Sequence, residues 1–270
     1  MLFTVYGGKM DGVNKTLYIP LYGKAYVSKK GVILSDIKAE KIWAKEGFEL
    51  KGRSKSKWLA YYMGMRSAVF DRWLKIKMKK MPGAIVIHIG CGMDSRVERV
   101  GCAGHEWYDV DFPEVIKERK KYYSESGSYH MIESDARNDK WIYKLPENKK
   151  AIVVMEGVSM YFKPDELTKL LKALKNHFNG VSVLMDCYST FAAKASKFKN
   201  PINDVGVTVV YGIDDPRLLG EKSGLEFISQ HKMLPEKLLR ELKGSEGIIF
   251  RMLYGGSIAK NLYKIYEFEG

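Results

Sequence analysis

Apolar residues along this 270-residue chain form two kinds of pattern, short continuous runs and helix-spaced repeats. From residue 84 onwards, runs of strand length recur and helical stretches separate several of them. The runs cover 84–89, 106–110, 129–132, 151–155 and 181–185, and the helical stretches cover 113–125 and 164–179. This alternation predicts an α/β fold, in which helices cover both faces of a mostly parallel sheet.

The last part of the chain departs from this alternation. Residues 225–231 and 262–268 have the pattern of strands, and a helical segment, 235–242, lies between them. In the final run, Tyr263, Ile265 and Phe268 stand among charged neighbours. We therefore expect an antiparallel strand to close the otherwise parallel sheet.

Residues 1–80 contain helical patterns and no buried strand, which predicts an N-terminal helical cap in front of a main domain at 81–270. The three helical stretches cover 21–30, 36–47 and 57–79. From Trp58 to Leu74, apolar residues recur at spacings near three and four, so this helix is expected to pack on the sheet. Because the chain has no apolar stretch of membrane length and no secretory signal, we expect a cytoplasmic protein that does not cross a membrane.

Charge and cysteine content narrow the class of protein. The chain has 45 Lys and Arg against 32 Asp and Glu, a net charge of +13, which favours anionic partners. The lysines are scattered, however, so a solvated basic surface is the simpler interpretation and nucleic acid is not the expected partner. Three cysteines without a CxxC pair argue against a disulfide framework and against a zinc site, and we expect no metal.

A glycine loop follows the first strand. Gly90 and Gly92 allow a sharp turn and a close approach of the backbone to a ligand. The third glycine of the dinucleotide pattern is replaced by Ser95, and Asp94 would repel a phosphate. A cofactor with an ammonium group fits this loop better than a pyrophosphate, which disfavours a nicotinamide dehydrogenase.

Acidic residues also follow the next strands. Asp111, preferred here over Asp109, stands 21 residues after Gly90, where a carboxylate can accept hydrogen bonds from both ribose hydroxyls. Asp135 follows the third run, and Glu156 with Gly157 follows the fourth. Each acid alone is as well explained as a turn or helix cap, but together they indicate a cofactor that carries a nucleoside.

The ordered set of motifs resembles one family over nearly the whole chain. The motifs are Leu17–Ala25, Tyr61-Tyr62 with Arg66, Phe70-Asp71, Gly90–Arg96, Val110–Ile116, Glu156–Tyr161 and Tyr211–Pro216. In this set the sequence is similar to the class I S-adenosylmethionine-dependent methyltransferases of the leucine carboxyl methyltransferase type, including the TcmP-like O-methyltransferases. The resemblance implies a Rossmann-like methyltransferase sheet, with S-adenosylmethionine as cofactor.

The resemblance also implies roles for single residues. Arg66 would hold the methionine carboxylate, Asp111 the ribose, Ser134-Asp135-Ala136 the adenine, and Glu156 the amino acid end. The full set of cofactor residues implied is Arg66, Gly90, Cys91, Gly92, Asp111, Phe112, Ser134, Asp135, Ala136, Glu156 and Gly157. The sequence departs from the family pattern at Ala136, where a larger aliphatic residue is usual, and at Ser159, where Leu is usual.

Methyl transfer needs alignment and exclusion of water more than a catalytic triad. The expected acceptor is a carboxylate of a small molecule or a peptide terminus, with a phenolic hydroxyl second, because a carboxylate needs no base at pH 7. None of the five histidines stands out as a base: His88, His105, His130, His177 and His231. The expected acceptor pocket involves a lid at 188–211 and the tyrosines Tyr18, Tyr22, Tyr161, Tyr188 and Tyr211. The alternatives are a nucleic-acid methyltransferase and a non-catalytic S-adenosylmethionine-binding protein.

Overall fold

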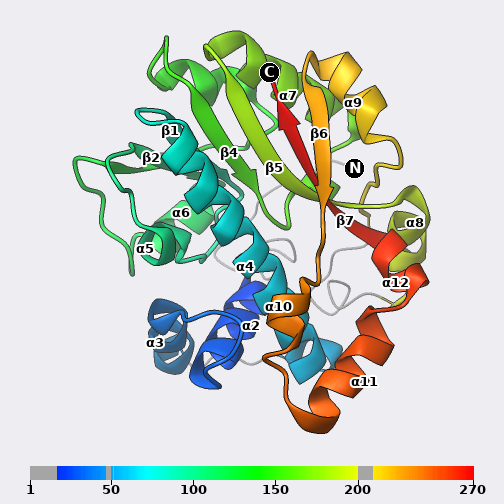
Figure 1. Cartoon of the computed structure of the whole chain (residues 1–270). Helices are drawn as coiled ribbons and strands as arrows, with labels where there is room; N and C mark the ends of the chain where they lie inside the picture. Colours follow the sequence, from blue (N-terminus) through cyan, green and yellow to red (C-terminus); the bar gives the residue numbers. More distant parts are fainter. Residues whose placement is uncertain (1–16, 47–49, 51, 200–208) are drawn as a thin grey trace.

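A computed structural model describes residues 17–46, 50, 52–199 and 209–270, which form a sheet with helices on both faces and a helical cap below it (Figure 1). The sheet has seven strands in the order β3-β2-β1-β4-β5-β7-β6. The strands are β1 Ile85–Ile89, β2 Trp107–Asp111, β3 Tyr129–Glu133, β4 Ala151–Met155, β5 Val181–Tyr188, β6 Glu226–His231 and β7 Tyr263–Glu269.

The strand directions confirm the prediction from the sequence. β1 pairs in parallel with β2 and β4, β2 with β3, and β4 with β5. β7 is antiparallel to both of its neighbours, β5 and β6. All seven strands fall on runs that the apolar pattern predicted, with ends that differ by at most three residues.

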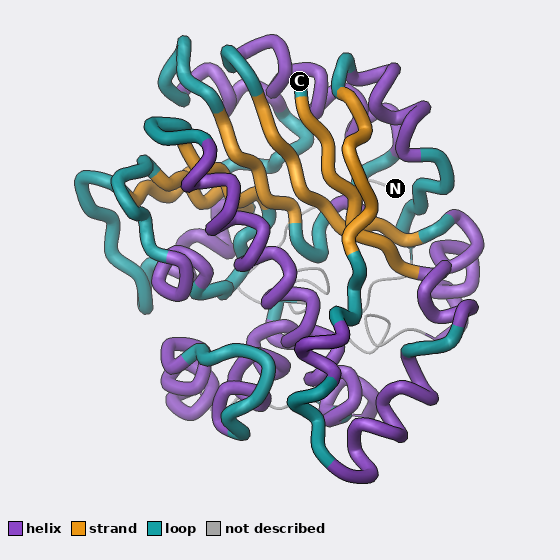
Figure 2. The backbone as a smooth tube through the Cα atoms, viewed as in Figure 1, coloured by secondary structure: helices purple, strands orange, loops and turns teal. Residues whose placement is uncertain are grey.

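Helices connect and cover these strands (Figure 2). The α-helices are α2 Tyr18–Lys29, α3 Ile37–Glu46, α4 Lys57–Lys80, α5 Arg96–Val100, α6 Pro113–Arg119, α7 Pro164–His177, α8 Thr190–Lys199, α9 Pro216–Ser223, α10 Glu236–Leu239, α11 Gly244–Tyr254 and α12 Ser257–Leu262. The short 3-10 helices are η1 Gly52–Lys55, η2 Asp139–Lys144 and η3 Ser159–Tyr161. Among the described residues, no helix combines the length and the apolar character needed to cross a membrane.

Two apolar layers hold the sheet between helices. On one face, Phe70 and Leu74 of α4 belong to the same buried cluster as Val86 and Leu184. On the other face, the leucines of α7 pack with the remaining strand residues, which include Ile87. Successive residues of one strand, such as Val86 and Ile87, therefore enter opposite layers, as the pleat of a strand requires.

The cap contains more than the N-terminal helices. Its apolar cluster combines Val27, Tyr61 and Met65 with Leu242 and Phe250, which lie in the segment between β6 and β7. The sequence pattern predicted one helix in that segment, whereas the structure has α10, α11 and α12 there. In Figure 1, α10 and α11 lie against the lower half of α4. The division of the chain near residue 80 stays a prediction, but the cap draws on both ends of the described chain.

The segment expected to form a lid, 188–211, is described in part. Thr190–Lys199 form α8, a helix that the sequence pattern did not predict, and residues 200–208 lie outside the described residues. At its far end, the Tyr211 amide donates to the Met160 carbonyl over 2.8 Å, and Gly212 forms a parallel bridge with Tyr188. The role of this segment as a lid stays a prediction.

Candidate functional site

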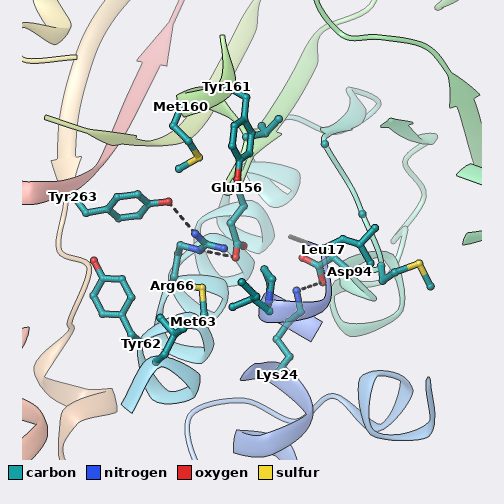
Figure 3. Close-up of a pocket in the computed structure, with 18 of the residues that line it drawn as sticks. Leu17, Lys24, Tyr62, Met63, Arg66, Asp94, Glu156, Met160, Tyr161 and Tyr263 are labelled. Atoms are coloured by element: carbon teal, nitrogen blue, oxygen red, sulfur yellow. Dashed lines mark hydrogen bonds and ion pairs between the residues drawn. The ribbon is translucent and has the colours of Figure 1, made fainter. Parts of the chain in front are cut away.

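A cavity of about 500 Å³ lies between the cap and the carboxyl ends of the central strands (Figure 3). Ligands of open α/β sheets bind at this edge, because the strand order reverses there between β1 and β4. Ten of the sixteen residues singled out in the sequence line the cavity: Arg66, Gly90, Cys91, Gly92, Asp111, Phe112, Glu156, Gly157, Tyr161 and Tyr188. The structure therefore brings together the residues expected at three of the four strand ends.

The glycine loop passes directly under this cavity. Gly90 has φ +69° and Gly92 has φ +49°, in the left-handed region that favours glycine. A Cβ on Gly90 would lie 2.7 Å from Cβ of Val158, so the loops after β1 and β4 can meet only because residue 90 has no side chain. This close approach leaves the backbone of the loop facing the cavity.

We expect Gly90→Ala to lower the free energy of unfolding by about 3 kcal/mol, because it adds backbone strain to a clash with Val158. Gly83→Ala is the matched control, since Gly83 has φ +76° and no heavy atom within 4 Å of the position of a Cβ. Urea unfolding should show a loss of only about 1 kcal/mol for this control. Equal losses for the two variants would contradict the importance of the contact with Val158.

Asp111 lies at the end of β2 and fixes the glycine loop. Its carboxylate accepts hydrogen bonds from the amides of Gly92 over 2.7 Å and Phe112 over 2.8 Å. Burial raises the pKa of Asp111 to about 6, although these two amides and Arg119 oppose the shift. The carboxylate is thus ionised at pH 7 and borders the cavity, where a ligand hydroxyl could donate to it.

Arg66 reaches the cavity from α4 and is 4% exposed. Its Nε donates to Oε1 of Glu156 over 2.9 Å, and its Nη1 donates to the hydroxyl of Tyr263 over 2.9 Å (Figure 3). The same Nη1 lies 3.2 Å from Oδ2 of Asp186. Burial alone would raise the pKa of Glu156, but the cations Arg96, Arg66 and Lys24 lower it to about 2. A cation and an anion, both buried and both ionised, therefore lie side by side at the cavity.

Asp94 has different surroundings from those that its sequence context suggested. Its carboxylate lies 3.3 Å from Nζ of Lys24, 3.2 Å from Nη2 of Arg96 and 2.7 Å from Nη1 of Arg99. Burial alone would raise the pKa of Asp94, but these three cations hold it well below its usual range. Asp94 is thus already compensated by protein cations, so an ammonium group of a ligand is not needed to balance it.

Lys24 is a residue of the cavity that the sequence reasoning missed. It is 2% exposed, and burial lowers its pKa although Asp94 and Glu156 oppose this effect. The sequence contained a signal for it, because Lys24 shares the buried face of α2 with Leu21 and Ala25. A lysine on the apolar face of a helix requires a buried partner, and Asp94 supplies it.

The segment expected at the adenine does not line the cavity. The amide of Ser134 donates to the carbonyl of Asp111 over 2.9 Å, so the segment is adjacent to the site. The carboxylate of Asp135 binds the Arg137 guanidinium, with Nε 2.9 Å away, and Ala136 packs on the apolar layer of α7. The role of these three residues at the adenine stays a prediction.

The tyrosines expected in the acceptor pocket divide into two groups. Tyr161 and Tyr188 line the cavity, whereas Tyr18, Tyr22 and Tyr211 do not. The Tyr22 hydroxyl donates instead to the carbonyl of Lys55 over 3.2 Å. Three tyrosines that the sequence reasoning did not select also line the cavity, namely Tyr62, Tyr254 and Tyr263.

Comparisons with known proteins indicate the family of the chain. A profile described as leucine carboxyl methyltransferase matches residues 15–175, which is more than half of the chain. The chain is 27% identical over 241 residues to the tetracenomycin polyketide synthesis O-methyltransferase TcmP of Streptomyces glaucescens, a match that covers 88% of this chain and 89% of that protein. It is 28% identical over 233 residues to the S-adenosyl-L-methionine-dependent methyltransferase dpfgK of Gibberella zeae, covering 78% of each chain.

A solved structure shows the same fold. Magnesium protoporphyrin IX methyltransferase from Synechocystis PCC 6803, with bound S-adenosylhomocysteine, superposes with a TM-score of 0.50 at 13% identity. The superposition covers 95% of this chain and 99% of that one. The sheet is therefore the Rossmann-like sheet of class I methyltransferases. The chain belongs to the leucine carboxyl methyltransferase family and is an S-adenosylmethionine-dependent methyltransferase.

Proposed function

We propose that this methyltransferase transfers the methyl group to an oxygen of a small molecule or peptide terminus, with a carboxylate as the preferred acceptor and a phenol second. The observation that carries the proposal is the lining of the cavity, which holds buried charges at the sheet edge and an apolar, tyrosine-rich wall toward the cap. Both curated relatives carry methyltransferase names, and one is named as an O-methyltransferase of polyketide synthesis.

The residues present fit the chemistry of the cofactor. S-adenosylmethionine carries a carboxylate, an ammonium group and a ribose diol, and its sulfonium supplies the methyl group. Arg66 and Lys24 would hold the carboxylate, Glu156 the ammonium group, and Asp111 the two ribose hydroxyls. Each of these side chains lines the cavity, and each is of a chemical type that matches its proposed partner.

In the described part of the chain, no histidine of the cavity is free to act as a base, which favours a carboxylate acceptor. Of the five histidines, only His88 lines the cavity. Its Nε2 lies 3.2 Å from Nη1 of Arg96, and its Nδ1 lies 3.4 Å from Oδ1 of Asp109, so both ring nitrogens face protein groups. Burial lowers the pKa of His88, although Asp109 opposes this effect. A carboxylate acceptor is already ionised at pH 7 and needs only alignment.

The acceptor would lie against an aromatic wall to which both the cap and the sheet contribute. Tyr62 and Tyr254 stack with ring centroids 4.9 Å apart, and Tyr188 meets Tyr263 edge to face, also at 4.9 Å. Together with Met63, these rings give the cavity an apolar surface that can hold a flat or apolar acceptor and exclude water.

Calorimetry with S-adenosylmethionine, S-adenosylhomocysteine and NAD tests the cofactor half of this proposal. We expect micromolar affinity for the two sulfur ligands and no binding of NAD. Absence of binding by both sulfur ligands would mean that the acids at the strand ends only cap turns, and the proposed site would then be wrong.

The pH dependence of methyl transfer distinguishes the two acceptor classes. With labelled methyl groups and saturating cofactor, the rate with a carboxylate acceptor should stay constant between about pH 7 and 9, because the acceptor is ionised throughout. The rate with a phenol should instead rise about tenfold per pH unit, because its pKa is near 10 and no base assists it. A pH-independent rate with a phenol would reveal a base and contradict the preference for carboxylates.

A further inference from the structure

A buried carboxylate and a tyrosine hydroxyl lie behind Arg66, on the last strands of the sheet. Asp186, near the end of β5, is fully buried and does not line the cavity. Its Oδ2 accepts a hydrogen bond from the hydroxyl of Tyr263 over 2.6 Å. The same hydroxyl accepts from Nη1 of Arg66, which itself lies 3.2 Å from Asp186. The three groups form a closed triangle.

Asp186 also holds the loop under the guanidinium. Its second oxygen, Oδ1, accepts from the amide of Gly157 over 2.7 Å. Gly157 has φ +73°, and a Cβ there would lie 3.1 Å from Nη2 of Arg66, so the guanidinium rests directly on this loop. One carboxylate thus fixes both the backbone under Arg66 and one nitrogen of its side chain.

Glu156 and Asp186 share Arg66 but differ in their other partners. Glu156 lines the cavity and is also bound by Arg96 and by the hydroxyl of Ser67 over 2.8 Å. Glu156 therefore has partners other than Arg66 and also borders the space that a ligand would occupy. Arg66 is the only cation paired with Asp186 among the described residues, and Asp186 is fully buried and does not line the cavity.

We propose that Asp186 and Tyr263 are positioning residues, which orient the Arg66 guanidinium toward the carboxylate of the cofactor. The proposal rests on the role proposed above for Arg66. It gives β7 a part in cofactor binding, because Tyr263 is the first residue of this strand and pairs with Tyr188 of β5. Binding of the cofactor then depends on β7 as well as on the carboxyl ends of β1, β2 and β4.

A comparison of two ligands separates positioning from general stability. S-adenosylhomocysteine carries the carboxylate and the ammonium group, whereas 5′-methylthioadenosine has the same nucleoside without them. We would measure both affinities by calorimetry for the unmodified protein, Tyr263→Phe and Asp186→Asn. Tyr266→Phe is the matched control, because Tyr266 is a buried tyrosine of the same strand that belongs to the apolar layer on the other face.

The expected result is a selective loss. The unmodified protein and Tyr266→Phe should prefer S-adenosylhomocysteine at least about tenfold, and Tyr263→Phe should reduce that preference about fivefold without changing the affinity for 5′-methylthioadenosine. Asp186→Asn should act in the same direction. If Tyr263 and Asp186 only stabilise the fold, the variants should lose affinity for both ligands equally and keep the preference unchanged. This result would overturn the proposal.

The outcomes also separate this proposal from the proposed function. If the unmodified protein shows no preference between the two ligands, the role of Arg66 at the carboxylate is wrong, and the positioning proposal fails with it. If the unmodified protein has the preference and Tyr263→Phe keeps it in full, Arg66 holds the carboxylate without help from Tyr263. Because Tyr263→Phe retains the ring, this second outcome overturns the positioning proposal even where Asp186→Asn does not fold.

Discussion

Arg66→Ala is expected to weaken the binding of S-adenosylmethionine at least about tenfold, because it removes the planar cation proposed to grip the methionine carboxylate. The effect should be large because Arg66 lines the cavity and is 4% exposed, held in place by buried partners. Isothermal calorimetry gives the affinity directly. An affinity equal to that of the unmodified protein would remove Arg66 from the cofactor site.

The same substitution should also destabilise the fold. It leaves the buried carboxylates of Glu156 and Asp186 without the guanidinium that lies between them, and breaking a buried ion pair from one side costs about 3–5 kcal/mol. The affinity therefore has to be measured well below the unfolding temperature of the variant. Arg72→Ala is the matched control, since Arg72 lies on the same helix with an exposed side chain. It should change neither the affinity nor the stability.

The sheet could be predicted from the sequence because its signals are local. Each run, such as 84–89 or 151–155, carries the length and apolar character of a buried strand within itself. The position of Asp111 could be predicted for the same reason, because the end of a parallel strand fixes the edge on which its side chain lies. Both predictions needed no knowledge of distant contacts.

The composition of the cap could not be predicted in this way. Whether α11 covers the sheet or joins the cap is decided by contacts such as that of Tyr61 with Phe250, whose ring centroids lie 6.0 Å apart. These residues are far apart in sequence, and the apolar pattern of α11 does not indicate its partner. The pairing of Lys24 with Asp94 escaped prediction for the same reason, although a lysine on the apolar face of α2 was a signal.

The position of Asp186 in the sequence was a signal that we did not use when we looked for acids at the ends of strands. It follows the apolar run 181–185 directly, just as Glu156 follows 151–155. In the structure both acids contact Arg66, one from the side of the cavity and the other from behind. The rule thus locates acids at the functional edge, but it does not distinguish an acid that faces a ligand from one that faces a protein cation.

Asp111→Asn is expected to weaken cofactor binding about 10- to 100-fold, because it replaces a charged acceptor for two ribose hydroxyls by a neutral amide with one acceptor oxygen. Asn can accept from only one of the Gly92 and Phe112 amides, so a moderate loss of stability at the glycine loop is expected. Removal of the charge itself should not destabilise the fold. Since burial raises the pKa of Asp111 to about 6 in the folded protein, its protonated form stabilises the fold at low pH, and this contribution is lost as the pH rises through about 6. Urea unfolding at pH 7 checks this expectation.

The same pKa predicts how the affinity for S-adenosylmethionine depends on pH. Above about pH 6, Asp111 is ionised and can accept from both hydroxyls, whereas below that pH a proton must be released on binding. The affinity of the unmodified protein should therefore fall by up to about tenfold per unit as the pH drops from 6 to 5. Asp111→Asn has no such proton, so its weaker affinity should stay nearly constant over this range. A fall of the same size in the variant would assign the pH dependence to another group, and Asp111 would then act on the glycine loop through Gly92 and not on the ribose.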